Sequence, residues 1–153
     1  MLALAAFLPA AILPPLIAQD SPLVTHTPPQ KIAAARGATV EAGVSFQVRS
    51  GYHANSNRPN EDYLIPLRLR WEPGPLAPVE VIYPKAEEKN YGFSAKPVSV
   101  FTGEFRVVTR FKVDANAPAG PGVLIGKLRY QACSDDTCYR PATLEIRLPY
   151  EIH

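Results

Sequence analysis

The chain of 153 residues lacks the features on which several common protein functions depend. Its sixteen Lys and Arg residues are dispersed among fourteen acidic residues, and the formal net charge is only +2, so we expect no nucleic-acid partner. A glycine-rich phosphate loop, a nucleophile elbow and an internal repeat are all absent. Two cysteines are too few for a framework of several disulfides. The length therefore predicts one domain with a single core.

The chain also has few segments in which a long helix could form, because seventeen prolines are spread through it. Many of them fall between runs in which apolar and polar residues alternate, which is the pattern of half-buried strands. Residues 98–113 are predicted to form one such strand or hairpin, with Phe101, Phe105, Val107, Phe111 and Val113 on one face. Similar runs cover residues 44–48, 67–71, 124–130 and 144–150. About seven short strands predict an all-β fold, an antiparallel β-sandwich of two sheets.

The first eighteen residues are uncharged and mostly apolar, and they end in the small residue Ala18. This pattern predicts a signal peptide over residues 1–18 and an exported protein. A retained membrane anchor is the alternative, although Pro9, Pro14 and Pro15 would interrupt its helix. The prolines of residues 19–30 predict an extended linker, which leaves residues 31–153 as the folded domain. Export would place the cysteines where a disulfide can form.

The two cysteines, Cys133 and Cys138, lie between two alternating runs and are separated by four polar residues, Ser134 to Thr137. We expect a hairpin loop that brings the cysteines close enough to form a disulfide. Closing so short a loop would stabilise the fold by only ~2 kcal/mol, which is a weak reason to keep the bond. A bond that opens and closes is the better explanation, and Tyr130 and Tyr139 could shelter it. A structural disulfide in a non-catalytic binding or scaffold module remains the alternative.

Charge distinguishes the two sulfurs. The two aspartates of the loop disfavour a nearby thiolate, so the pair is not expected to be a strong oxidant. Cys133 is closer in sequence to Asp135, whereas Cys138 is followed by Tyr139 and Arg140. Cys138 is therefore predicted to be the sulfur that exchanges with partners.

The residues Tyr130-Gln131-Ala132-Cys133 and Cys138-Tyr139-Arg140-Pro141 resemble the active-site hairpin of the DsbD N-terminal domain family. The resemblance extends to residues 50–66 and 81–92 and covers roughly residues 35 to 150. It implies an immunoglobulin-like sandwich in the periplasm that takes electrons from a membrane-embedded donor and passes them to thioredoxin-like and other thiol–disulfide proteins. Cytochrome c biogenesis is one process that such a relay would serve.

The resemblance also implies roles for individual residues. Cys138 would form the mixed disulfide with partners, and Cys133 would resolve it. A cap loop over residues 88–92 would cover the sulfurs until a partner docks. The family's cap carries two adjacent aromatic residues, whereas here Asn90 precedes Tyr91, which leaves Tyr91 and Phe93 to shield the disulfide, with Gly92 between them. Tyr52 and His53 lie in the segment that would pack near the hairpin.

The sequence also contains residues that are typical of two other kinds of site, a metal site and a pair of hydrolytic carboxylates. His26, His53 and His153 could join the cysteines in a copper or zinc site, but their spacing matches no ligand motif, so we expect no metal. The acidic pairs Glu61-Asp62 and Glu87-Glu88 are predicted to be solvated loop residues and not hydrolytic carboxylates. We expect a monomer that acts on protein partners, with no organic cofactor and no small-molecule substrate. Whether this domain is free-standing or part of a longer transmembrane protein stays open.

Overall fold

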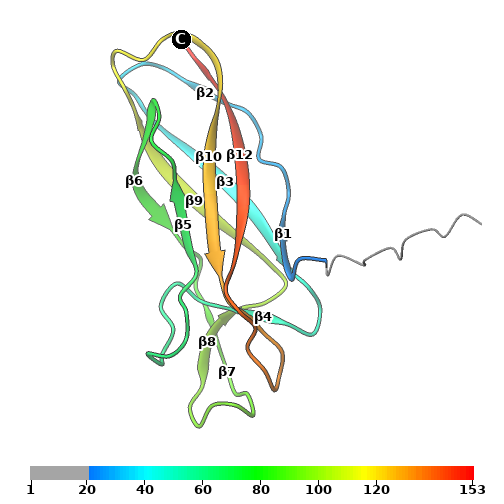
Figure 1. Ribbon diagram of the computed structural model, residues 1–153. Helices are drawn as coiled ribbons and strands as arrows, with labels where there is room; N and C mark the ends of the chain where they lie inside the picture. Colours follow the sequence, from blue (N-terminus) through cyan, green and yellow to red (C-terminus); the bar gives the residue numbers. More distant parts are fainter. Residues whose placement is uncertain (1–20) are drawn as a thin grey trace, which may run out of the picture.

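The computed structural model describes residues 21–153, and in this part of the chain strands and loops make up the whole fold. Two sheets of four strands form the body of the molecule (Figure 1). The first has the order β1 (Val24–His26), β3 (Thr39–Val48), β9 (Glu104–Val113) and β6 (Leu76–Ile82). The second has the order β2 (Ile32–Ala34), β12 (Ala142–Ile152), β10 (Gly120–Tyr130) and β5 (Arg68–Trp71). All neighbours are antiparallel except β2 and β12, which are parallel.

The alternating residues of these strands fill the core, as the sequence predicts. On β9, Phe105, Val107, Phe111 and Val113 are all buried, and β3 places Val44, Phe46 and Val48 against them. Trp71 on β5 donates a hydrogen bond from its indole nitrogen to Oγ1 of the buried Thr109 at 2.9 Å, which links the two sheets. The predicted immunoglobulin-like antiparallel sandwich is therefore confirmed.

Two expectations about the strands need correction. Residues 98–113 form two strands, β8 (Val98–Phe101) and β9, because the chain turns at Thr102 and Gly103, where Gly103 has a φ of +57°. The part of the predicted linker that the structure describes contains β1, which pairs with β3 and buries Val24 completely. The folded unit therefore begins before residue 31. The predicted signal peptide and the alternative anchor lie outside the described residues, and no helix of residues 21–153 is long and apolar enough to cross a membrane.

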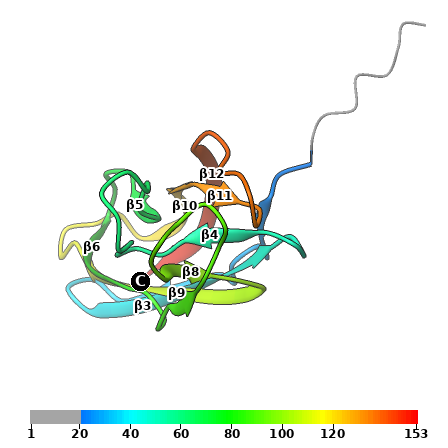
Figure 2. The ribbon, with the colours of Figure 1, turned by 90° about the horizontal axis from the view of Figure 1, so that it is seen from below.

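A third, smaller sheet lies at one end of the sandwich, opposite the C-terminus (Figures 1 and 2). Its order is β11 (Ala132–Cys133), β4 (His53–Asn55), β8 and β7 (Glu87–Lys89). β11 follows β10 after one residue, and β8 precedes β9 by two residues. The long strands β10 and β9 of the sandwich are thus directly connected to this sheet, which contains Cys133.

Candidate functional site

Cys133 and Cys138 form a disulfide with an S–S distance of 2.11 Å and a Cα–Cα distance of 4.0 Å. The two residues face each other across an antiparallel bridge. Backbone hydrogen bonds lie on either side of this bridge, from Ser134 to Thr137 at 2.8 Å and from Tyr139 to Ala132 at 2.9 Å. The cysteines therefore occupy a non-hydrogen-bonded pair, the position at which opposed side chains come closest. The predicted hairpin loop is confirmed.

The two sulfur-bearing residues differ in exposure. Cys133 is completely buried, whereas Cys138 is only partly buried. Cys138 packs against a small apolar cluster made by Leu64, Val98 and Val100, which is separate from the two clusters of the sandwich. An incoming thiolate has a shorter path to Cys138 than to Cys133.

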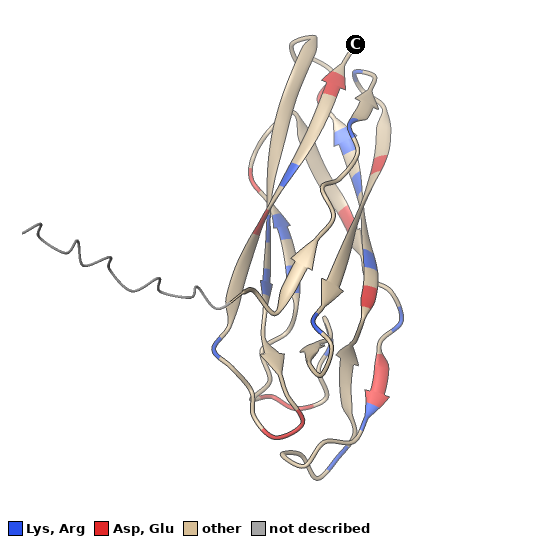
Figure 3. Ribbon diagram, turned by 90° about the vertical axis from the view of Figure 1, so that its right-hand side faces the viewer, with Lys and Arg blue, Asp and Glu red and all other residues tan. Residues whose placement is uncertain are grey.

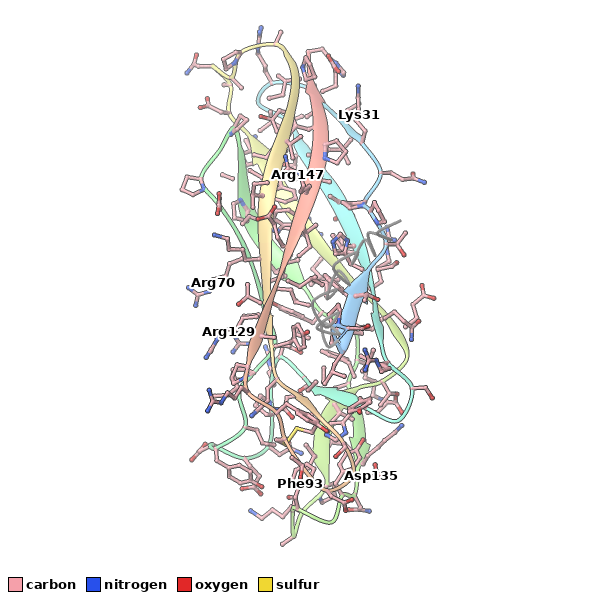
Figure 4. All side chains as sticks on the ribbon, turned by 45° about the vertical axis from the view of Figure 1, so that its right-hand side comes forward. Lys31, Arg70, Phe93, Arg129, Asp135 and Arg147 are labelled. Carbon is pink, nitrogen blue, oxygen red and sulfur yellow. A yellow bond between two sulfur atoms is a disulfide. The ribbon has the colours of Figure 1, made fainter. Side chains whose placement is uncertain are left out.

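The loop between β7 and β8 lies over this end of the molecule and carries two aromatic rings. Tyr91 stacks on His53 with ring centroids 3.9 Å apart, and Phe93 lies nearly parallel to Tyr91 at 5.6 Å. Both rings pack on the same cluster as Cys138. A Cβ atom on Gly92 would lie 3.9 Å from the backbone oxygen of Asp135, so the loop backbone passes close to the cysteine hairpin. Figure 4 shows Phe93, Asp135 and the disulfide together at this end.

The cap loop expected over residues 88–92 begins later, because Glu88 and Lys89 belong to β7, and we call residues 90–93 the cap. Its first residue, Asn90, is exposed and takes no part in the aromatic stack that the structure describes. The sequence singled out Tyr91 as the main shield, with Phe93 as its companion, and the structure places both rings beside the hairpin. The stack continues beneath them through His53.

His53 lies directly opposite Cys133 in the register of β4 and β11, and its side chain is 1% exposed. Its Nε2 atom is buried without a hydrogen-bond partner. Burial lowers the pKa of His53 from 6.5 to about 4, against the opposing effect of Asp135 and with a smaller contribution from Lys89. The imidazole beside the disulfide is therefore neutral at neutral pH.

The other aromatic residues singled out by the sequence lie in different places. Tyr139 is 43% exposed, and its ring lies 6.0 Å from that of Tyr52, centroid to centroid. The guanidinium of Arg49 lies 6.0 Å from the centroid of Tyr52. Tyr130 is buried in the main core of the sandwich, not in the cluster around Cys138. The cap, and not Tyr130, thus supplies the rings that pack on the same apolar cluster as Cys138.

Gln131 is a supporting residue that stands out in the sequence only as part of the motif before Cys133. Its Oε1 atom accepts hydrogen bonds from Asn55 Nδ2 at 2.9 Å and from the backbone nitrogen of Ile65 at 3.0 Å. Its Nε2 atom donates to the backbone oxygen of Tyr139 at 3.1 Å. One side chain therefore ties both strands of the cysteine hairpin to β4 and to the loop after it. A lone glutamine gives no periodic signal, so only the family motif could have drawn attention to it.

Two segments at this end of the molecule carry pairs of acidic residues (Figure 3): the hairpin loop has Asp135 and Asp136, and β7 has Glu87 and Glu88. Lys89 is paired with Glu87 at 3.1 Å. The pKa of Tyr91 is raised, mainly by burial and further by Asp135 and Glu87.

The described residues contain no group of His, Cys, Asp and Glu side chains that could hold a metal ion. His26 hydrogen-bonds to the backbone oxygens of Thr27 and Glu145, and His153 is the terminal residue, so neither joins His53. The acidic pairs make ordinary surface contacts. Glu61 approaches Lys96, Glu87 accepts from Thr102, and Glu88 accepts from Asn60. Asp62 has no polar side-chain contact in the described part of the chain.

A groove of about 440 Å³ opens beside the cap. It is lined by residues of the β3–β4 turn, by Lys89 and Tyr91, and by His53 and Asp135.

Comparisons with known proteins bear on the family and the fold of this chain. The sequence profile of the family described as thiol:disulfide interchange protein DsbD, N-terminal, matches residues 21–149. The chain is similar to the reduced N-terminal domain of DsbD from Neisseria meningitidis (22% identity, 76% of this chain and 82% of that one, TM-score 0.49). It is also similar to the N-terminal periplasmic domain of ScsB from Proteus mirabilis (14% identity, TM-score 0.55), covering 82% of this chain and 44% of that chain.

The structural similarity to the ScsB domain supports the fold. A search of curated protein sequences finds no match to the chain. The profile match, which covers most of the chain including both cysteines, supports a role in thiol–disulfide interchange. The chain belongs to the family of DsbD N-terminal domains.

Proposed function

We propose that this domain relays reducing equivalents outside the cytoplasm, through reversible opening of the Cys133–Cys138 disulfide. The observation that carries the proposal is the arrangement of that bond: one sulfur-bearing residue buried, the other partly exposed, and two stacked aromatic rings beside them on a separate loop. A disulfide carries two electrons by itself, so the relay needs no metal or organic cofactor. The partners are proteins with dithiol or disulfide centres, a membrane thiol transporter on one side and thioredoxin-like clients on the other.

Reduction begins when a thiolate of the donor protein attacks Sγ of Cys138, the more exposed residue of the pair. The S–S bond breaks, its electron pair goes to Cys133, and Cys138 is left in a mixed disulfide with the donor. A second thiolate of the donor then attacks the donor's own sulfur in that mixed disulfide. The donor leaves oxidised, and this domain holds two thiols after taking up two electrons and two protons.

Delivery runs through the same atom. The Cys138 thiolate attacks a client disulfide, and one client sulfur leaves as a thiolate. Cys133, buried beside Cys138, then attacks Cys138 Sγ in the mixed disulfide, which restores the intramolecular bond and releases the reduced client. Because Cys133 is inaccessible from solvent, it is suited to this resolving step and not to the first attack.

The cap provides the gate in this scheme. With Tyr91 and Phe93 in place, the apolar surface around Cys138 is shielded from small oxidants and stray thiols. A docking partner would displace the two rings and put its own sulfur in their place. The acidic loop beside the disulfide keeps the thiolate fraction low between encounters, which adds to the protection.

The rival proposal is a binding or scaffold module whose disulfide only pins the hairpin. The hairpin is already held by backbone hydrogen bonds and by Gln131, and the short loop makes the disulfide worth only ~2 kcal/mol. These observations favour the relay.

Trapping of mixed disulfides separates the two proposals. In the Cys133→Ala variant, Cys138 can attack partners but nothing can release them, so covalent adducts should accumulate in exporting cells and appear on non-reducing gels. The matched control, Cys138→Ala, leaves only the buried cysteine and should give at most a trace of adducts. If Cys133→Ala gives no adducts, or if the two variants give equal amounts, the relay proposal fails.

A further inference from the structure

His53, Cys133 and Cys138 lie in a row across neighbouring strands at the end of the molecule. Cys133 pairs with His53 on one side and with Cys138 on the other. Directly opposed residues of antiparallel strands point to the same face with their Cβ atoms about 5 Å apart. The imidazole of His53 is therefore the nearest cross-strand neighbour of Cys133 on the side away from Cys138.

The ring of His53 is also held in place. Tyr91 stacks on it at 3.9 Å and Phe93 lies 6.0 Å away, and the side chain is almost completely buried. In spite of this, Nε2 makes no hydrogen bond in the oxidised protein. A buried nitrogen without a partner is costly, so its presence calls for an explanation. A disulfide sulfur is a poor partner, whereas a thiol donates a hydrogen bond and a thiolate accepts one strongly.

We propose that His53 becomes the hydrogen-bond partner of the Cys133 sulfur when the disulfide opens, and that it thereby stabilises the reduced form of the pair. The inference rests on the proposed function, since it requires that the bond opens. It adds a residue that tunes the equilibrium between the oxidised and reduced forms.

The bond changes are as follows. When a donor thiolate attacks Cys138, the electron pair of the broken S–S bond goes to Cys133 Sγ, and the N–H of the neutral imidazole donates a hydrogen bond to that thiolate. A proton from solvent then converts Cys133 to a thiol. In the resolving step Cys133 gives its proton back to solvent, attacks Cys138 Sγ and leaves the imidazole without a partner again.

The charged and titratable groups around His53 are compatible with a neutral ring that donates. Asp135 of the hairpin loop and Lys89 at the end of β7 act on it with opposite signs, and Tyr91 of the cap is un-ionised at neutral pH because its pKa is raised. A neutral donor adds no positive charge, so by stabilising the Cys133 thiolate it makes the disulfide only modestly more oxidising.

The first test compares two substitutions at this position. His53→Phe keeps a flat ring beneath Tyr91 but removes both nitrogens, whereas His53→Gln keeps an N–H group near the position of Nε2. We expect the equilibrium with glutathione to shift about tenfold toward the oxidised form in His53→Phe, which is about 30 mV for a two-electron couple, and less than about threefold in His53→Gln. Equal shifts in both variants, or no shift in His53→Phe, would overturn the proposal.

The second test needs no substitution and covers the case in which a variant fails to fold. Nitrogen chemical shifts of the histidine rings are compared in the oxidised and the reduced wild-type protein, with His26 and His153 as internal references. Formation of the hydrogen bond should move the Nε2 signal of His53 on reduction while the reference signals stay in place. An unchanged Nε2 signal refutes the inference. Neither test uses a protein partner, so failure here is distinguishable from failure of the trapping experiment.

Discussion

The substitution Tyr91→Ala tests whether the cap controls access to the disulfide. Tyr91 makes two ring contacts, with His53 at 3.9 Å and with Phe93 at 5.6 Å. The contact with Phe93 lies within the cap, so the substitution removes only the contact with His53, worth about 0.5–1.5 kcal/mol, from the closing equilibrium of the cap. Since 1.4 kcal/mol is tenfold, the open fraction should rise between about twofold and about twelvefold.

The assay is the rate at which dithiothreitol reduces the oxidised protein, followed by acid quenching, alkylation and mass spectrometry. If the reductant reaches Cys138 only when the cap is open, the rate should rise by the same factor as the open fraction. Tyr150→Ala is the matched control, because Tyr150 is a half-buried tyrosine on β12, near Gly122 at the opposite end of the sandwich. Its rate should equal that of the wild type. A Tyr91→Ala rate within twofold of the wild type would refute the gating role of the cap.

Three further predictions concern the support of the site. The free energy of unfolding of the oxidised protein should fall by up to ~3 kcal/mol as the pH is lowered from 6.5 to about 4, because His53 is protonated in the unfolded state but stays neutral in the folded state. Urea titrations at several pH values should show this decrease. The pH dependence should be weaker in His53→Phe. Gln131→Ala removes the hydrogen bond to Tyr139 and two others, and should lower the unfolding free energy by about 2–3 kcal/mol in the same assay, while Gln47→Ala on β3 should cost less than about 1 kcal/mol. Gly126→Ala would place a Cβ 2.7 Å from the Trp71 ring, so a loss of about 1–3 kcal/mol and an altered tryptophan fluorescence spectrum are expected; unchanged values would show that the ring moves freely.

The alternation of apolar residues was sufficient to predict the sandwich and its buried faces. The prediction for β9 and β3 was accurate residue by residue, since Phe46, Val107 and Phe111 are buried as expected. Alternation identifies the face on which a side chain lies, but it does not identify the strand that pairs with it. For this reason the third sheet, and the division of residues 98–113 between two sheets, could not be predicted.

The strand β1 was missed because it is only three residues long and lies among prolines. The burial of Val24 comes from pairing with β3, a contact that no local pattern records. At the site, the hairpin and its disulfide followed from spacing, and the cap followed from family resemblance. The stacking of His53 under Tyr91 and the ties of Gln131 depend on segments far apart in the sequence, so they became visible only in the fold.

The β10–β12 ladder has a consequence for how the domain would turn over. It pairs eleven residues of each strand without a break and leads directly to the cysteine hairpin. The Cys133–Cys138 disulfide joins residues only five positions apart at the end of this ladder, so opening the disulfide would leave the course of the backbone unchanged. The oxidised and the reduced protein would then present the same docking surface to partner proteins. A donor and a client could not bind to this surface together, so each would bind only after the other had dissociated. Turnover would therefore follow ping-pong kinetics.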